Sequence, residues 1–137
     1  MTALVLAPKL REQIAREALA ALPRECCGLI EGVREGETVR ATALHSTRNL
    51  SPDTDRFEID PADHFKALRA ARAAGGDIVG CYHSHPNGKA EPSPRDAAGA
   101  FEAGFVWLIA ALSPGNAAAK FAAYVFSGGA FHVVRTD

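Results

Sequence analysis

The sequence has no excess of charge of either sign, and it has no long apolar run. Fifteen Lys and Arg residues face 16 Asp and Glu residues, for a formal net charge of −1. Nucleic acids and anionic membranes attract a basic surplus, so we expect neither as a partner. No apolar run approaches the roughly 18 residues of a membrane span. The run 3–7 is too short for a signal-peptide core and follows no basic segment. The protein is therefore expected to be cytoplasmic.

Cysteine is scarce, and linker-like segments and repeats are absent. The three cysteines, Cys26, Cys27 and Cys81, are odd in number and two are neighbours, which makes a poor disulfide framework. We expect them to be small buried thiols. A chain of 137 residues with 47% apolar and 23% charged residues is typical of a globular protein, and its length predicts one domain, residues 1–137.

The pattern of apolar residues and turn signals predicts an α/β or α+β layered fold, a mixed β-sheet flanked by helices. Leu10, Ile14, Ala18 and Leu22 form the apolar stripe of a first helix, and Phe65 and the residues at helical spacing after it set the register of a second. Asp60 and Pro61 are a typical helix start. The predicted helices are 8–22, 61–74 and 93–104, and the predicted strands are 26–32, 38–44, 77–85, 105–112, 121–126 and 130–135, with a weaker strand at 56–59.

Two histidines stand two residues apart at the end of the predicted strand 77–85. Side chains alternate between the faces of a strand, so His83 and His85 project to the same side, with Cα atoms about 6.5 Å apart. Both imidazoles can then reach one ion through bonds of about 2.0–2.1 Å. Pro86 cannot donate a ladder hydrogen bond, so the pair faces a loop. The pattern indicates an open metal site that needs a further ligand.

Asp96 is the best candidate for a third ligand, because the loop before it can fold the first turn of the next helix back over the histidines. Two histidines and one carboxylate form a recurring catalytic zinc set that leaves a position for water. Such ligands favour zinc over magnesium or calcium, and leave iron, cobalt and manganese open. Ser93 and Asp96 also form a helix-capping signature that explains both residues without a metal. Cys81 lies on the same strand face, further from the strand end, and is a weaker rival ligand.

These residues together resemble a known family. The segment 83–96 matches the signature H-[S/T]-H-P-x6-S-x2-D of the JAMM metalloproteases, also called JAB or MPN+. That family also has an upstream glutamate where a helix gives way to a strand, and Glu25 stands 58 residues before His83 in the segment Glu-Cys-Cys-Gly-Leu-Ile. The resemblance covers most of the chain, whose length is similar to that of the compact prokaryotic members. It implies a JAB/MPN domain with a layout like that of cytidine deaminases.

The resemblance implies a role for each matching residue. His83, His85 and Asp96 correspond to the zinc ligands, Glu25 to the general base and Ser93 to the group that stabilises the transition state. One zinc ion (Zn²⁺) per chain is implied, as is hydrolysis of an amide bond with a zinc-bound water as the nucleophile. Apart from the resemblance, nothing in the sequence singles out Glu25 from the acids that follow it.

The resemblance also implies a protein substrate. The family cleaves isopeptide or peptide bonds at the C-terminus of ubiquitin-like proteins, and the compact bacterial members resemble enzymes that act on small β-grasp sulfur carriers. Such a tail is extended and can add as a strand to a sheet edge, here supplied by segment 38–44 or 45–54. Three alternatives stay open: a non-catalytic MPN-type protein-binding module, a zinc hydrolase of a small-molecule amide, and a cysteine nucleophile with a histidine base. The deaminase pattern H-x-E with P-C-x-x-C and the protease pattern H-E-x-x-H are both absent.

Overall fold

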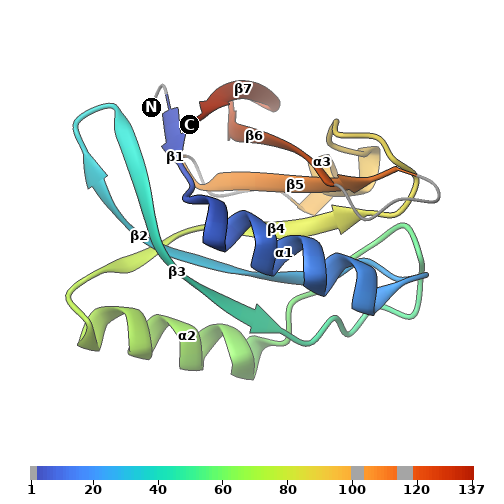
Figure 1. Ribbon diagram of the computed structural model, residues 1–137, viewed down its shortest axis with the longest axis horizontal. Helices are drawn as coiled ribbons and strands as arrows, with labels where there is room; N and C mark the ends of the chain where they lie inside the picture. The colour runs from blue at the N-terminus through green and yellow to red at the C-terminus, as the bar shows by residue number, and fades with distance from the viewer. Residues whose placement is uncertain (1–2, 100–103, 114–118) are drawn as a thin grey trace.

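A strongly curved mixed sheet forms the centre of the protein. The computed structural model describes residues 3–99, 104–113 and 119–137. Within these residues, seven strands close into a barrel in the order β1-β3-β2-β4-β5-β6-β7, and α1 and α2 pack against opposite faces of the sheet (Figure 1). The strands are β1 (Ala3–Val5), β2 (Cys27–Glu35), β3 (Thr38–Thr47), β4 (Asp77–His85), β5 (Val106–Leu112), β6 (Ala119–Ser127) and β7 (Ala130–Thr136). The predicted mixed sheet flanked by helices is confirmed.

The two ends of the chain close the barrel. The short strand β1 pairs in parallel with both β3 and β7, and the backbone N–H of Leu6 donates to the carbonyl of Asp137 over 2.8 Å. Figure 1 shows the two termini side by side at this seam. The pairing of β4 with β5 is also parallel, and the remaining neighbours are antiparallel. Closure was not predicted, because a strand of three residues is too short to show a period in the sequence.

The first helix, α1 (Pro8–Ala21), matches its predicted stripe at Ile14 and Ala18, which are both buried. Leu22 lies beyond the helix end and is 47% exposed, so the stripe stops one turn earlier than predicted. No helix in the described ranges is long and apolar enough to cross a membrane.

The second helix, α2 (Pro61–Ala73), begins as predicted, with the Asp60 carboxylate accepting the N–H of Ala62 over 2.8 Å. The predicted register was wrong: Phe65 is 61% exposed, and the buried face consists of Ala67 and Ala71. Small residues let the helix approach the sheet closely, and hydrophobicity alone misses them. The third helix, α3 (Pro94–Gly99), begins at the predicted residue, and its predicted end near 104 lies outside the described residues.

The alternation of side chains along the strands divides the core in two. Ile30, Tyr82 and Leu108 point to the face that α1 covers. Leu29 and Ile109 point to the opposite face, where α2 and the segment 49–59 lie. Because His83 is one residue after Tyr82, it belongs to this second face. The strand end that carries the histidines therefore emerges between the sheet and segment 49–59.

A tyrosine ties the first helix to the strand that carries the histidines. Tyr82 is fully buried, and its hydroxyl donates to the Glu17 carboxylate over 2.7 Å. To reach Glu17 its ring crosses β2 at Gly28, where a Cβ atom would lie 2.3 Å from the ring. Only glycine leaves room for this crossing. The contact fixes β4 one residue before His83.

The strand β3 extends three residues further than predicted, to Thr47. Its outer side pairs with β1 only at Thr38, Val39 and Arg40. Among the described residues, the outer edge of 41–47 therefore has no strand partner. The weak strand predicted at 56–59 is absent, and a single bridge joins Asn49 to Ile59 instead.

Candidate metal centre and active site

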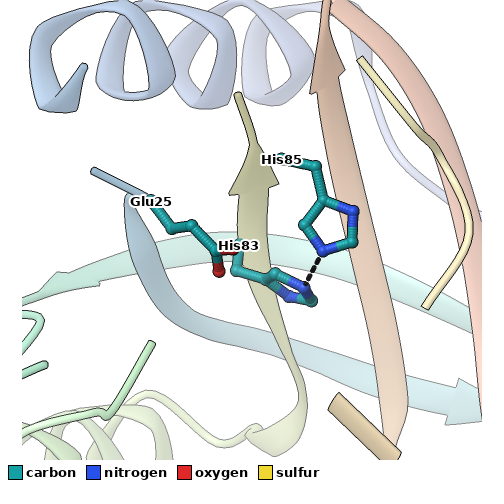
Figure 2. Close-up of side chains that lie close together, drawn as sticks. All are labelled: Glu25, His83 and His85. Carbon is teal, nitrogen blue, oxygen red and sulfur yellow. Dashed lines mark hydrogen bonds between the residues drawn. The ribbon is translucent and has the colours of Figure 1, made fainter. Parts of the chain in front are cut away.

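The last residues of β4 bring the two predicted histidines together. Both side chains are buried on the same face, and their Nε2 atoms lie 3.0 Å apart. Figure 2 shows the two rings meeting edge-on at the strand end, with Glu25 approaching from the start of β2. Two ring nitrogens this close repel unless a proton or a cation lies between them. The geometry predicted from the spacing of His83 and His85 is thus present.

The first turn of α3 brings Asp96 to the histidine pair. Its Oδ2 atom lies 3.2 Å from the Nε2 of His83 and 3.1 Å from that of His85. The Ser93 N–H donates to the same Oδ2 over 2.8 Å, while the Ser93 Oγ accepts the N–H of Asp96 over 3.0 Å. The predicted capping of α3 is confirmed, and it also aims Asp96 at the histidines.

The three atoms have the spacing of metal ligands. They lie 3.0–3.2 Å from one another. In a tetrahedral zinc site with bonds of about 2.0–2.1 Å, two ligand atoms are about 3.3–3.4 Å apart. The observed separations are shorter than those of a zinc site by a few tenths of an ångström at most. The residues present therefore fit a small divalent cation.

The protonation states of Asp96 and His83 suit a cation, whereas the surroundings of His85 favour its protonated form, so that a cation has to displace a proton there. Burial opposes ionisation of Asp96, but its contacts with His83 and His85 outweigh burial and hold its pKa well below the ordinary range. Burial lowers the pKa of His83 and so favours the neutral ring that a metal requires. For His85, burial is outweighed by its contacts with Asp96 and Lys89, and its pKa lies above the ordinary value. The site combines a fixed negative charge with imidazole nitrogens.

The tautomer of His85 is set by a backbone carbonyl. Its Nδ1–H donates to the carbonyl oxygen of Lys89 over 2.8 Å, because a carbonyl oxygen can only accept. The Nε2 of the neutral ring then carries the lone pair that faces Asp96. Orientation through the second ring nitrogen is the usual arrangement for a metal-bound histidine.

Glu25 lies beside the histidines, two residues before the first residue of β2. Its neighbour Cys26 is fixed to β4 by two bonds: the Cys26 N–H donates to the Ser84 Oγ over 2.8 Å, and the Ser84 N–H donates to the Cys26 carbonyl over 3.1 Å. Glu25, His83 and His85 each offer a ligand atom within 4.8 Å of the others. Burial raises the pKa of Glu25 to about 8; Asp96 adds to the rise and His85 opposes it. Its Oε1 atom is buried and accepts no hydrogen bond from any described residue.

The thiols are poorly suited to nucleophilic attack. Cys26, Cys27 and Cys81 are all buried, and none is in a disulfide. Burial raises the pKa of Cys26 to about 12 and that of Cys27 to about 11. A reactive cysteine needs the opposite shift. Cys81 packs in the core beside Leu29, away from the strand end. Its position therefore does not favour a role as a metal ligand.

Two residues that the sequence analysis did not select also belong to this region. Asn49 donates through its side chain to the Glu25 carbonyl over 3.0 Å, and the Phe57 ring stacks on the His83 ring with centroids 4.3 Å apart. No sequence pattern marks either residue, since a loop asparagine and an isolated phenylalanine are common. Only the folded chain brings them to the histidines.

Comparison with known proteins gives a consistent family assignment. A protein-family model described as prokaryotic homologs of the JAB domain matches residues 7–124. The chain is 39% identical over 111 residues to a desampylase of Haloferax volcanii, covering 77% of this chain and 78% of that protein. It is 42% identical over 86 residues to a probable TtuB-protein conjugate cleaving protease of Thermus thermophilus, covering 63% and 53% of the two chains. The solution structure of a protein from Desulfitobacterium hafniense aligns with 28% identity and a TM-score of 0.87, covering 100% of this chain and 92% of that one.

Proposed function

We propose a specific reaction for this chain, which belongs to the family of prokaryotic homologs of the JAB domain and is a JAMM-type hydrolase. It is a zinc-dependent isopeptidase or peptidase that hydrolyses the amide bond at the C-terminal tail of a ubiquitin-like or sulfur-carrier protein. The observation that carries the proposal is the convergence of His83, His85 and Asp96 at 3.0–3.2 Å beside a buried carboxyl group with a raised pKa.

His83, His85 and Asp96 would hold the metal, and Glu25 would remain outside the ligand set. The distances between the atoms support this division, because Asp96 contacts both Nε2 atoms. The pKa values support it as well. Asp96 is the stronger acid and suits a permanent anionic ligand, while a pKa of about 8 makes Glu25 a base near neutral pH.

A bound zinc ion supplies Lewis acidity and brings the pKa of a water molecule to about 7. Glu25 accepts the proton of the attacking water on its open Oε1 atom and then delivers it to the leaving amine. The Ser93 hydroxyl uses its oxygen to accept the N–H of Asp96, so its own proton is available to donate to the developing oxyanion. Atoms and protons balance with water as the only co-reactant.

The tail would bind along the outer edge of β3. A cavity of about 460 Å³ lies between the C-terminal half of α1 and this edge, and its lining includes Glu17, Ser46 and Thr47. The same cavity reaches Glu25. An extended peptide can pair with the unpartnered backbone of 41–47 and enter the site at Glu25. Backbone pairing suits a substrate with small tail residues, since it requires no side-chain pocket.

The desampylase and the TtuB-conjugate protease support a substrate of this class, because their names describe removal of small protein modifiers. The decisive experiment incubates the zinc-loaded protein with β-grasp carrier proteins that bear C-terminal extensions, and weighs the products by mass spectrometry. We expect cleavage directly after the carrier tail, and its loss with a chelator but not with a thiol alkylator. An intact extension would favour the non-catalytic binding module. Cleavage of small amides alone would favour the small-molecule hydrolase.

A further inference from the structure

The side chain of Asn49 uses all of its hydrogen-bonding capacity within the candidate site. Its Nδ2 donates to the carbonyl of Glu25 over 3.0 Å and to that of Arg56 over 3.3 Å. Its Oδ1 accepts the N–H of Ser51 and that of Glu58, each over 3.0 Å. An amide side chain offers two donor hydrogens and one acceptor oxygen with two lone pairs, so this set is complete.

Two of these bonds flank a single aromatic residue. Phe57 lies between Arg56 and Glu58, whose backbone groups Asn49 holds from the same side. The Leu50 N–H also donates to the carbonyl of Glu58 over 2.8 Å. The backbone on both sides of Phe57 is therefore fixed, and with it the position of the ring.

The Phe57 ring in turn fixes a histidine that lacks the usual hydrogen bond. The buried Nδ1 of His83 has no partner among the described residues, whereas that of His85 is bonded to Lys89. Phe57 stacks on the His83 ring at 4.3 Å with an interplanar angle of 21°, and Trp107 meets it edge-on at 5.8 Å. Ring contacts take the place of the hydrogen bond that normally orients a metal-bound histidine.

We propose that Asn49 is a positioning residue that couples the general base to a metal ligand: one amide holds the backbone of Glu25 and, through Phe57, the ring of His83. The inference rests on the proposed function. Displacements of about 1 Å at a reacting group can reduce turnover about 100-fold, so a shared support for Glu25 and His83 has a direct effect on catalysis.

The test uses variants that separate the contact of Asn49 with Glu25 from the contact of Phe57 with His83. Asn49→Asp keeps the two acceptor contacts and loses both donors, which removes the bond to Glu25 and one of the two bonds beside Phe57. Phe57→Leu keeps apolar bulk and removes the stacking. Asn87→Asp is the matched control, because among the described residues Asn87 bonds only through its Oδ1 atom, which accepts the N–H of Lys89, and aspartate retains that atom.

Two readouts are measured: metal affinity with the cobalt absorption spectrum, and kcat with KM for tail cleavage. We expect Phe57→Leu to weaken zinc binding 10–100-fold in a chelator competition and to alter the cobalt spectrum. We expect Asn49→Asp to lower kcat about 100-fold with KM within about twofold of the wild type, and also to shift the cobalt spectrum. Asn87→Asp should match the wild type in both readouts.

The outcomes distinguish this inference from the proposed function. Folded Asn49→Asp and Phe57→Leu proteins with wild-type affinity, spectrum and kcat would overturn the coupling while leaving the isopeptidase intact. A wild-type protein that binds cobalt but cleaves no tail would contradict the reaction, and the spectra alone would still decide whether Phe57 orients His83. A wild-type protein that binds no cobalt would overturn both.

Discussion

Ser93 and Asp96 hold each other through two reciprocal hydrogen bonds, of 2.8 Å from the Ser93 N–H and 3.0 Å from the Asp96 N–H. The same Oδ2 atom that accepts from Ser93 faces both histidines. The same pair of hydrogen bonds therefore caps the start of α3 and orients the Asp96 carboxylate towards the histidines. A substitution at Ser93 therefore affects both the helix cap and the position of Asp96.

Replacing Ser93 by alanine should remove a helix cap and a catalytic donor at once. Loss of the cap should lower the free energy of unfolding by about 1 kcal/mol. Loss of the hydroxyl donor should lower kcat by about 100-fold. Urea unfolding and steady-state cleavage measure the two effects, and Ser93→Thr, which keeps the hydroxyl, is the control. A Ser93→Ala protein with wild-type kcat would limit Ser93 to its capping role.

Replacing Glu25 by glutamine should abolish turnover while zinc remains bound. Glutamine is nearly isosteric but cannot accept the water proton, and a general base contributes about 100- to 10,000-fold. Cleavage rate and zinc content per chain are the measurements. Glu35→Gln is the control, since Glu35 is exposed, pairs with Arg40 and should not affect either. Loss of zinc from Glu25→Gln would make Glu25 a ligand, in line with its position beside the two histidines.

Zinc should stabilise the fold through three residues and not through Cys81. A ligand present at 1,000 times its dissociation constant raises the free energy of unfolding by about 4 kcal/mol. Asp96→Asn should lose most of that rise, because the amide brings no negative charge to the cation. Cys81→Ala should keep it, whatever its effect on the metal-free protein. Thermal unfolding with and without zinc measures the difference, and a zinc response that disappears in Cys81→Ala would restore the cysteine as a ligand.

The strands and helices that the sequence predicted best are those with a strong local signal. Asp77–His85 is predicted over its full length, because a buried apolar run ends at a proline. The starts of α2 and α3 follow from their capping residues. Barrel closure depends instead on Ala3–Val5 meeting the last strand, a contact between the two ends of the chain that no local pattern contains.

The candidate site likewise contains residues that the local sequence predicts and residues that only the folded chain brings together. The spacing of His83 and His85 on one strand fixes their common face, so local geometry is sufficient to predict it. Glu25 is 58 residues away and was identified only through the family resemblance. Asn49 and Phe57 act through contacts that exist only after segment 49–59 has folded against the sheet. Their role depends on tertiary packing, which residue type alone does not encode.

The contribution of Glu25 to the stability of the metal-free protein should decrease as the pH rises through the range in which Glu25 titrates. Burial raises the pKa of Glu25 from 4.5 to about 8. Between these values Glu25 binds more protons in the folded state than in the unfolded chain, so its contribution to the free energy of unfolding falls with increasing pH and levels off above about 8. Urea unfolding of the metal-free wild type and Glu25→Gln, at pH 5 to 9, isolates this effect, because His83 and Asp96 are present in both. The stability of the wild type minus that of the variant should decline across the range. A flat or rising difference would mean that the folded protein already holds Glu25 ionised at low pH, and that burial does not make it the base we propose.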